Sequence, residues 1–186
     1  LVHALTGRGL KAVMVATGQT GLIQGARYGV ALDAMPSQFC AGEMEGAVVA
    51  AFEGERPDVI VIEGQSALGH PAYLSSGFIL RGSQPQGVIL QHAPTRLMRC
   101  DFDDLLIPTP ASEINLIETF ADTKVIGLTI NHENMTDVEV DAVILLYELE
   151  LGIPATDALT HSPDLLVEMV LRAFPALEAK LATVAA

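Results

Sequence analysis

Four apolar segments of this chain each end in polar residues whose types could bind a ligand or move a proton. The first is followed by Thr17-Gly18-Gln19-Thr20-Gly21, the second by Glu63-Gly64-Gln65-Ser66, the third by Gln91-His92-Ala93-Pro94 and the fourth by Asn131-His132-Glu133-Asn134. Amides, hydroxyls, carboxylates and imidazoles exchange hydrogen bonds with ligands, and an imidazole also titrates near neutral pH. A single polar loop is ordinary, so the four ends indicate a site only when they are taken together.

Glu63 and His70 are our candidates for acid–base catalysis. Glu63 ends a buried segment, where a carboxylate must be solvated, paired or bound to a cation. It is a candidate general base, magnesium ligand or anchor for a substrate amine, and a loop-stabilising acceptor is the structural alternative. His70 precedes Pro71 and could accept a proton, although a lone histidine is more often structural. His92 is a weaker candidate of the same kind.

The segment from Thr17 to Gly21 combines hydroxyls with two glycines. Glycine lets the backbone approach a ligand closely and expose N–H groups to an anion. A plain turn between a strand and a loop is the structural alternative. The segment is not a phosphate-binding loop, because G-x-x-x-x-G-K-[ST] occurs nowhere in the chain.

Arginines are scarce, since the chain has 10 Lys and Arg residues against 23 Asp and Glu residues. Four arginines fall in or near the predicted loops: Arg27, Arg81, Arg96 and Arg99. One or two of these could form paired hydrogen bonds with a carboxylate or phosphate. For each, an ion pair with an acidic residue is the structural alternative. We expect no metal site, because the neighbours His132 and Glu133 would face opposite ways in a strand.

The pattern of the chain alternates between strands and helices. We expect strands over 11–16, 58–62, 87–91 and 124–130. We expect helices over 44–53, over 112–120, over 136–151 and from Ser162 onward. The segment 70–80 favours a helix with loops, and 93–111 has the pattern of a loop. Strands that are apolar on both faces predict an α/β fold with a three-layer, mostly parallel sheet flanked by helices. Ligands bind such sheets beyond the carboxyl ends of the strands, so we expect the four polar ends to share one crevice.

Composition indicates one compact α/β domain over residues 1–186. Half of the residues are hydrophobic and the net charge is −13, which excludes a disordered chain and disfavours nucleic acids and anionic membranes as partners. The sequence lacks an apolar run of roughly 18 residues and a basic signal-peptide region, so a cytoplasmic location is the default. Cys40 and Cys100 are expected to be reduced and buried. The apolar content allows a homo-oligomer.

The chain starts at Leu1 rather than Met, and residues 1–5 have the pattern of the last turns of a helix before Gly7. We therefore expect a C-terminal fragment of a longer protein, with a missing N-terminal segment as its partner.

The motifs Ala16-Thr17-Gly18-Gln19-Thr20-Gly21 and Glu63-Gly64-Gln65-Ser66-Ala67-Leu68-Gly69-His70-Pro71 resemble a known family, and Gln91-His92-Ala93-Pro94 and Asn131-His132-Glu133-Asn134-Met135 fit it too. It is the P-loop domain of the proteins that include the D-glutamate N-acetyltransferases, and the resemblance covers essentially the whole chain. The pattern is more distantly similar to dethiobiotin synthetase-like P-loop enzymes. A phosphate loop and a further Rossmann-like domain would precede this segment in the family.

The resemblance implies transfer of an acetyl group from acetyl-CoA to the amine of D-glutamate, which gives N-acetyl-D-glutamate in D-amino-acid catabolism. It assigns cofactor binding to Thr17, Gly18, Gln19, Thr20 and Asn131. Substrate binding falls to Gln65, Ser66, Arg81, His92 and Arg96, and His70 or Glu63 would be the base. Direct transfer is favoured, because neither cysteine has an evident basic partner.

Two alternatives remain open. An ATP- and Mg²⁺-dependent ligase or NTPase of the dethiobiotin synthetase type would use Glu63 to hold the metal and Asn131 to contact the base. A regulatory or assembly domain with a vestigial pocket would need neither residue.

Overall fold

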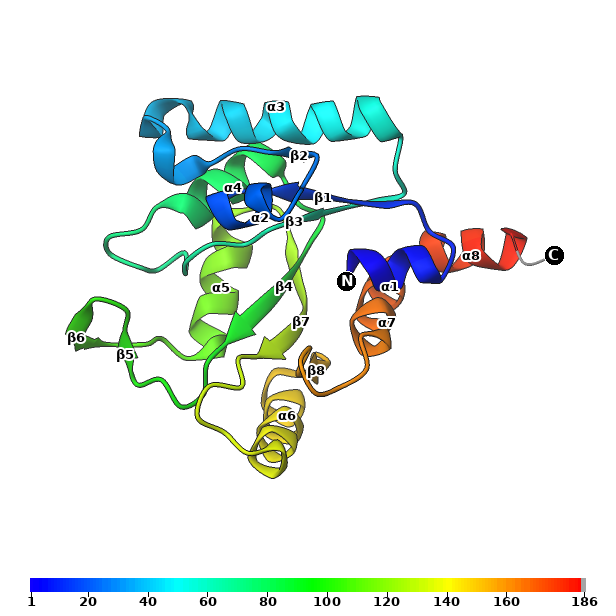
Figure 1. The fold of residues 1–186 in the computed structure, drawn as a ribbon. Coiled ribbons are helices and arrows are strands. Elements are labelled where there is room, and N and C mark those ends of the chain that lie inside the picture. Colours follow the sequence, from blue (N-terminus) through cyan, green and yellow to red (C-terminus); the bar gives the residue numbers. More distant parts are fainter. Residues whose placement is uncertain (185–186) are drawn as a thin grey trace. The chain divides into compact units, whose positions relative to one another are not determined.

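The computed structural model describes residues 1–184, in which helices alternate with short strands (Figure 1). The chain divides into two compact units: the first comprises residues 1–85 with the segment from Phe174 onward, and the second comprises residues 86–173. Among the described residues, no helix has both the length and the apolar character needed to cross a membrane.

The first unit is built on a parallel sheet with the strand order β2-β1-β3. Its strands are β1 (Ala12–Ala16), β2 (Tyr28–Gly29) and β3 (Val59–Ile62). Its helices are α1 (Val2–Gly7), α2 (Gln19–Ile23), the 3-10 turn η1 (Leu32–Ala34), α3 (Ser37–Glu55), α4 (Ser75–Ser83) and α8 (Pro175–Val184).

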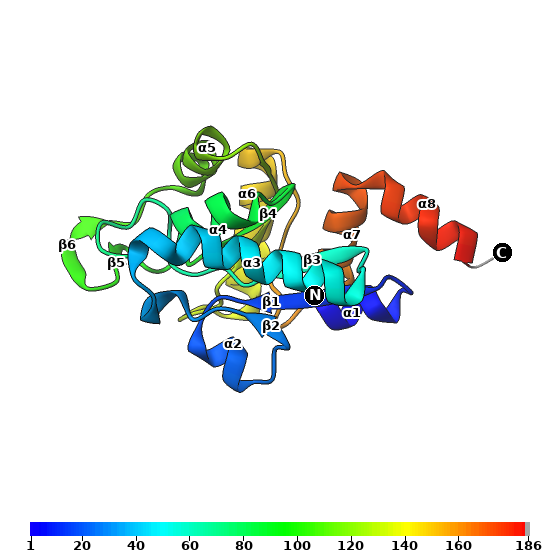
Figure 2. The ribbon, with the colours of Figure 1, turned by 90° about the horizontal axis from the view of Figure 1, so that it is seen from above.

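The core of the first unit lies between the sheet and the pair α3 and α4, which lie side by side (Figures 1 and 2). Val15 of β1 and Met44 of α3 are fully buried there. The β-branched residues of β3 pair with β1 in register from Ala12 opposite Val59 to Val15 opposite Ile62. An ion pair between Lys180 and Asp58 attaches α8 to the start of β3.

The second unit is built on a parallel sheet with the order β4-β7-β8 and carries an antiparallel hairpin, β5-β6. Its strands are β4 (Gly87–His92), β5 (Met98–Arg99), β6 (Phe102–Leu106), β7 (Lys124–Ile130) and β8 (Ala155–Thr156). Its helices are α5 (Pro110–Phe120), α6 (Asp137–Leu151) and α7 (Asp164–Ala173).

Helices cover both faces of β7, as the apolar strand pattern predicts. Leu128 and Ile130 point to one face and pack against α6, while Gly127 points to the other face, toward Met169 of α7. A Cβ atom at Gly127 would lie 2.5 Å from the Met169 sulfur, so glycine is required for this close approach.

The predicted fold class is confirmed, since parallel sheets are flanked by helices in both units. The four predicted strands match β1, β3, β4 and β7 within about a residue at each end. The capping box that opens α6 is present, because Thr136 accepts from the Glu139 N–H and the Glu139 side chain accepts from the Thr136 N–H. Gly152 ends that helix in the left-handed conformation, with φ of 67°.

Several details differ from the expectation. The parallel strands form two hydrogen-bonded sheets, one in each unit, instead of one. The loop predicted over 93–111 contains the β5-β6 hairpin, and Cys100, expected to be buried, lies exposed in its turn, whereas Cys40 is buried. Helix α3 begins at Ser37, seven residues before the predicted start. The prediction missed its first turns because Ser37, Gln38 and Gly42 interrupt the helical apolar pattern there. A single domain over residues 1–186 stays a prediction.

Candidate functional site

Glu63 links the carboxyl ends of the neighbouring strands β1 and β3. Its Oε2 atom accepts hydrogen bonds from the backbone N–H groups of Thr17, at 2.8 Å, and Gly18, at 3.1 Å. The Thr17 hydroxyl, which is fully buried, also donates, to the Glu63 carbonyl oxygen at 3.0 Å. Glu63 therefore accepts hydrogen bonds that stabilise the loop after β1, which was the structural alternative for this residue. The Gly18 N–H already has the Glu63 carboxylate as its acceptor.

The two glycines of this loop allow the close approach of its neighbours. A Cβ atom at Gly18 would lie 2.5 Å from the Gln65 side-chain nitrogen, and one at Gly21 would lie 2.9 Å from Glu63 Oε2. The loops after β1 and β3 therefore touch, as expected for adjacent parallel strands. Gln19 and Thr20 continue this loop into the first turn of α2, where both are exposed.

The loop after β3 is held from α4. The Ser76 hydroxyl donates to the carbonyl oxygens of Gln65 and, at 3.1 Å, of Ser66. Ser66 adopts a left-handed conformation, with φ of 49°. Arg81 lies five residues further along α4, in its last turn.

His70 is buried, and its ring organises the turn that follows it. The Nδ1 atom accepts from the backbone N–H groups of Ala72, at 3.2 Å, and Tyr73, at 3.3 Å. The imidazole also stacks on the Tyr73 ring, with centroids 4.5 Å apart. Because Nδ1 is the accepting atom, the neutral ring carries its proton on Nε2. The assignment of His70 or Glu63 as the base stays a prediction.

In the second unit, His92 ends β4 and meets Tyr147 of α6. Its Nδ1 atom lies 3.0 Å from the Tyr147 hydroxyl, and the two rings pack edge to face. Burial lowers the pKa of His92 and, together with the charge of Glu150, raises the pKa of Tyr147. Both groups are therefore neutral at pH 7.

His132 and Asp157 pair at the ends of β7 and β8. The Nδ1 atom of His132 lies 2.6 Å from Asp157 Oδ2, and Asp157 is completely buried. The hydrogen bond to Asp157 raises the pKa of His132 against the smaller effect of burial. Burial works to raise the pKa of Asp157, but its hydrogen bonds with Leu159, His132 and Thr160 outweigh it and hold that pKa low.

The loops after β4 and β7 are tied together. The Thr95 hydroxyl donates to the Glu133 carbonyl oxygen at 2.6 Å, and the Arg96 guanidinium pairs with the Glu133 carboxylate. The Asn131 N–H donates to the His92 carbonyl oxygen at 2.7 Å, and the Asn131 side chain accepts from the Glu133 N–H at 3.1 Å. Five predicted or neighbouring polar residues thus meet at one edge of this sheet.

The predicted residues therefore form two sets. Thr17, Gly18, Gln65 and Glu63 come together in the first unit, and His92, Asn131 and Arg96 come together in the second. A single crevice shared by both sets stays a prediction. Sequence reasoning did not single out Tyr147 or Asp157. Asp157 directly follows the two-residue strand β8, which is too short to give a periodic signal.

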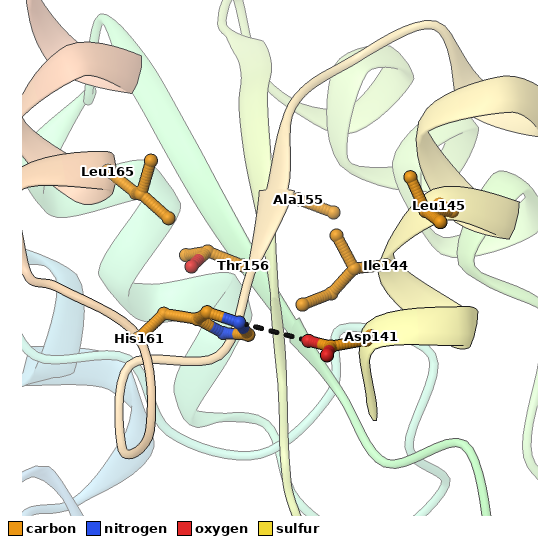
Figure 3. Close-up of a pocket in the computed structure, with 7 residues that line it drawn as sticks. All are labelled: Asp141, Ile144, Leu145, Ala155, Thr156, His161 and Leu165. Atoms are coloured by element: carbon orange, nitrogen blue, oxygen red, sulfur yellow. Dashed lines mark hydrogen bonds and ion pairs between the residues drawn. The ribbon is translucent and has the colours of Figure 1, made fainter. Parts of the chain in front are cut away.

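A hollow of about 320 Å³ lies in the second unit between α6, β8 and the segment that leads into α7 (Figure 3). Ile144, Leu145 and Leu165 give it apolar walls. His161 Nε2 lies 3.0 Å from Asp141 Oδ1, as the dashed line shows. The buried Thr156 hydroxyl has no hydrogen-bond partner among the described residues. None of the predicted site residues lines this hollow.

Two curated relatives are similar to most of the chain. A D-glutamate N-acetyltransferase from Tritonibacter scottomollicae is 33% identical over 168 residues, which is 87% of this chain and 49% of that protein. A D-glutamate N-acetyltransferase from a Pseudoalteromonas species is 29% identical over 162 residues, or 82% of this chain and 46% of that protein. The chain thus spans about half the length of the curated relatives it matches.

The fold has a counterpart among solved structures. The crystal structure of a DUF1611 family protein from Anabaena variabilis superposes with a TM-score of 0.84 at 30% identity, over 91% of this chain and 51% of that one. Residues 1–167 match the family described as a domain of unknown function, the DUF1611 C-terminal P-loop domain. With the parallel sheets and the polar loops at their carboxyl edges, this match places the chain in the DUF1611 family, as its C-terminal P-loop domain.

Proposed function

We propose that the protein containing this chain transfers an acetyl group from acetyl-CoA to the amine of D-glutamate. The observation that carries the proposal is the 33% identity to a D-glutamate N-acetyltransferase over 87% of the chain. Each unit is chemically compatible with part of this reaction, because the first offers amide donors and the second an arginine and titratable groups at the edges where parallel sheets bind ligands.

The reaction needs hydrogen-bond donors for the thioester oxygen as that oxygen gains negative charge. The Gly18 N–H already donates to Glu63, so we assign this role to the Gln19 and Gln65 side-chain amides and the Gly64 N–H. Glu63 then acts as a positioning residue that fixes the loop carrying Gln19 beside the loop carrying Gln65.

The substrate also needs partners for its two carboxylates. Arg96 is our first choice, because its guanidinium already binds a carboxylate, that of Glu133, at the carboxyl edge of the second sheet. A substrate carboxylate would replace Glu133 in this pair. Cytoplasmic acetyl-CoA would then supply the acetyl group, and a homo-oligomer is the assembly we expect.

The test is a ligand comparison on the full-length protein. Acetyl-CoA should raise the melting temperature, and D-glutamate should then release the CoA thiol, while L-glutamate should do so much more slowly. A rise in melting temperature with Mg²⁺-ATP alone, without thiol release, would instead favour the ligase or NTPase alternative, in which Glu63 holds the metal.

A further inference from the structure

The pair of His132 and Asp157 has the geometry of a base and the group that orients it. The two residues follow β7 and β8, which are neighbouring parallel strands with Leu128 opposite Ala155. Asp157 accepts three hydrogen bonds, from His132, from the Leu159 N–H at 2.9 Å and from the Thr160 hydroxyl at 2.7 Å. A fully buried carboxylate with three donors is held in one orientation, and it fixes the imidazole in turn.

The second ring nitrogen of His132, Nε2, has an acidic neighbour at the start of α6. Nε2 lies 3.5 Å from an oxygen of Asp137, whose side chain is 80% exposed. Because Nδ1 donates to the Asp157 carboxylate, the lone pair of the neutral imidazole is on Nε2. A histidine whose Nδ1 atom is held by a buried carboxylate matches the base and orienting group of nucleophile-activating sites.

A carboxylate-binding group lies in the same loop cluster. Glu133 follows His132 in the chain and pairs with Arg96, and the Thr95 hydroxyl fixes the backbone of the same loop at 2.6 Å. An amino acid whose carboxylate is bound by Arg96 would therefore have its amine near this edge of the sheet.

The other candidate proton acceptors already use accepting atoms in hydrogen bonds within the protein. The lone pair of His70 on Nδ1 already accepts two backbone N–H groups, and one oxygen of Glu63 accepts two more. Nδ1 of His92 is engaged by Tyr147. His132 combines a fixed tautomer, a buried carboxylate partner on Nδ1 and an Nε2 atom whose neighbour, Asp137, is largely exposed.

We propose that His132 is the proton acceptor of the acetyl transfer and that Asp157 is its positioning residue. This rests on the proposed function. Nε2 takes a proton from the substrate ammonium, and the neutral amine nitrogen attacks the thioester carbon. The new C–N bond forms, the C–S bond breaks, the second proton of the nitrogen goes to the leaving sulfur to give the CoA thiol, and His132 returns its proton to water.

The experiment uses the full-length protein with acetyl-CoA and D-glutamate. His132→Gln should lower kcat by about 10²–10⁴-fold, the usual contribution of a general base, with little change in KM. Imidazole added to His132→Ala should restore part of the rate. The matched control is His161→Gln, which removes another His–Asp pair of the same unit and should leave kcat unchanged.

The pH profile separates a chemical role from a structural one. Asp157 on Nδ1 and Asp137 near Nε2 are the charged groups that face the His132 imidazole among the described residues, with the Arg96–Glu133 pair in the adjoining loop. The wild-type rate should rise with pH as His132 loses its proton. In Asp157→Asn that inflection should move to lower pH, whereas Asp137→Asn should move it less.

The outcomes are distinguishable. Acetyl transfer by the wild type with an undiminished rate in His132→Gln, or with no rescue by imidazole in a folded His132→Ala, overturns the role of His132 and leaves the proposed function standing. A wild type that transfers no acetyl group overturns the proposed function and this role with it.

Discussion

Thr17 donates two hydrogen bonds to Glu63, one from its backbone and one from its side chain. The Thr17 N–H donates to the Glu63 carboxylate at 2.8 Å, and the Thr17 hydroxyl donates to the Glu63 carbonyl oxygen at 3.0 Å. The contact fixes the carboxyl end of β1 against that of β3, across 46 positions of sequence. The loops that carry Gln19 and Gln65 therefore have their relative position set by Glu63.

Removing the Glu63 carboxylate should destabilise the first unit. In Glu63→Ala, the buried Thr17 N–H and its neighbour Gly18 lose their acceptor, and each unsatisfied group costs about 1–3 kcal/mol. Glu63→Gln should cost less, because its amide oxygen still accepts. Urea unfolding checks this, with the exposed Glu45→Gln on α3 as the control. Equal midpoints for Glu63→Ala and Glu45→Gln would contradict the anchoring role.

Two glycine-to-alanine substitutions should change the free energy of unfolding in opposite directions. In Gly21→Ala the new Cβ would lie 2.8 Å from the Ala16 Cβ and 2.9 Å from Glu63 Oε2, so overpacking should cost about 1–3 kcal/mol. In Gly42→Ala, within the exposed part of α3, nothing lies within 4 Å, so a gain of about 0.5–1 kcal/mol is expected. Thermal unfolding of both variants measures the difference, and a stabilised Gly21→Ala would be inconsistent with the contact.

Threonine-to-valine changes test the hydrogen-bond assignments in both units. Thr156→Val removes a buried hydroxyl that has no partner among the described residues, and it should raise the free energy of unfolding by about 1 kcal/mol. Thr17→Val removes a buried hydroxyl that is bonded to Glu63, and it should lower that free energy by about the same amount. A loss of stability in Thr156→Val as large as in Thr17→Val would show that the Thr156 hydroxyl is satisfied.

The pKa of His132 predicts the pH dependence of stability. Its hydrogen bond to Asp157 raises the folded-state pKa above the ordinary value near 6.5, so this stabilisation is fully present below that value and is lost as the pH rises through the folded-state pKa. The free energy of unfolding of the wild type should therefore exceed that of His132→Gln most just below the ordinary pKa, and the excess should shrink as the pH rises through the folded-state pKa of His132. The oppositely shifted His92 is common to both proteins and cancels in the difference. A difference that does not shrink with rising pH would contradict the pair.

Much of the fold follows from local sequence signals. The β-branched run at Val59–Ile62 and the apolar run of β7 are strands in the structure, and the capping box at Thr136 with Gly152 correctly bounds α6. These elements were predictable because their periodicity and end signals are contained within a few residues.

The rest depends on contacts between distant segments. The hairpin β5-β6 has neither an apolar alternation nor a strong turn signal, and β8 has only two residues. The partner of Glu63 is fixed by the pairing of β1 with β3, and that of His132 by the pairing of β7 with β8. Residue types at strand ends could be read from the sequence, but the atoms that they bind could not.

The most direct test of acetyl transfer is mass spectrometry of the products formed from isotopically labelled acetyl-CoA and D-glutamate by the full-length protein. The account predicts labelled N-acetyl-D-glutamate and one equivalent of free CoA, with His132→Gln producing both far more slowly. Labelled acetyl-CoA that stays intact while ATP is consumed, or that is merely hydrolysed to acetate, would contradict it.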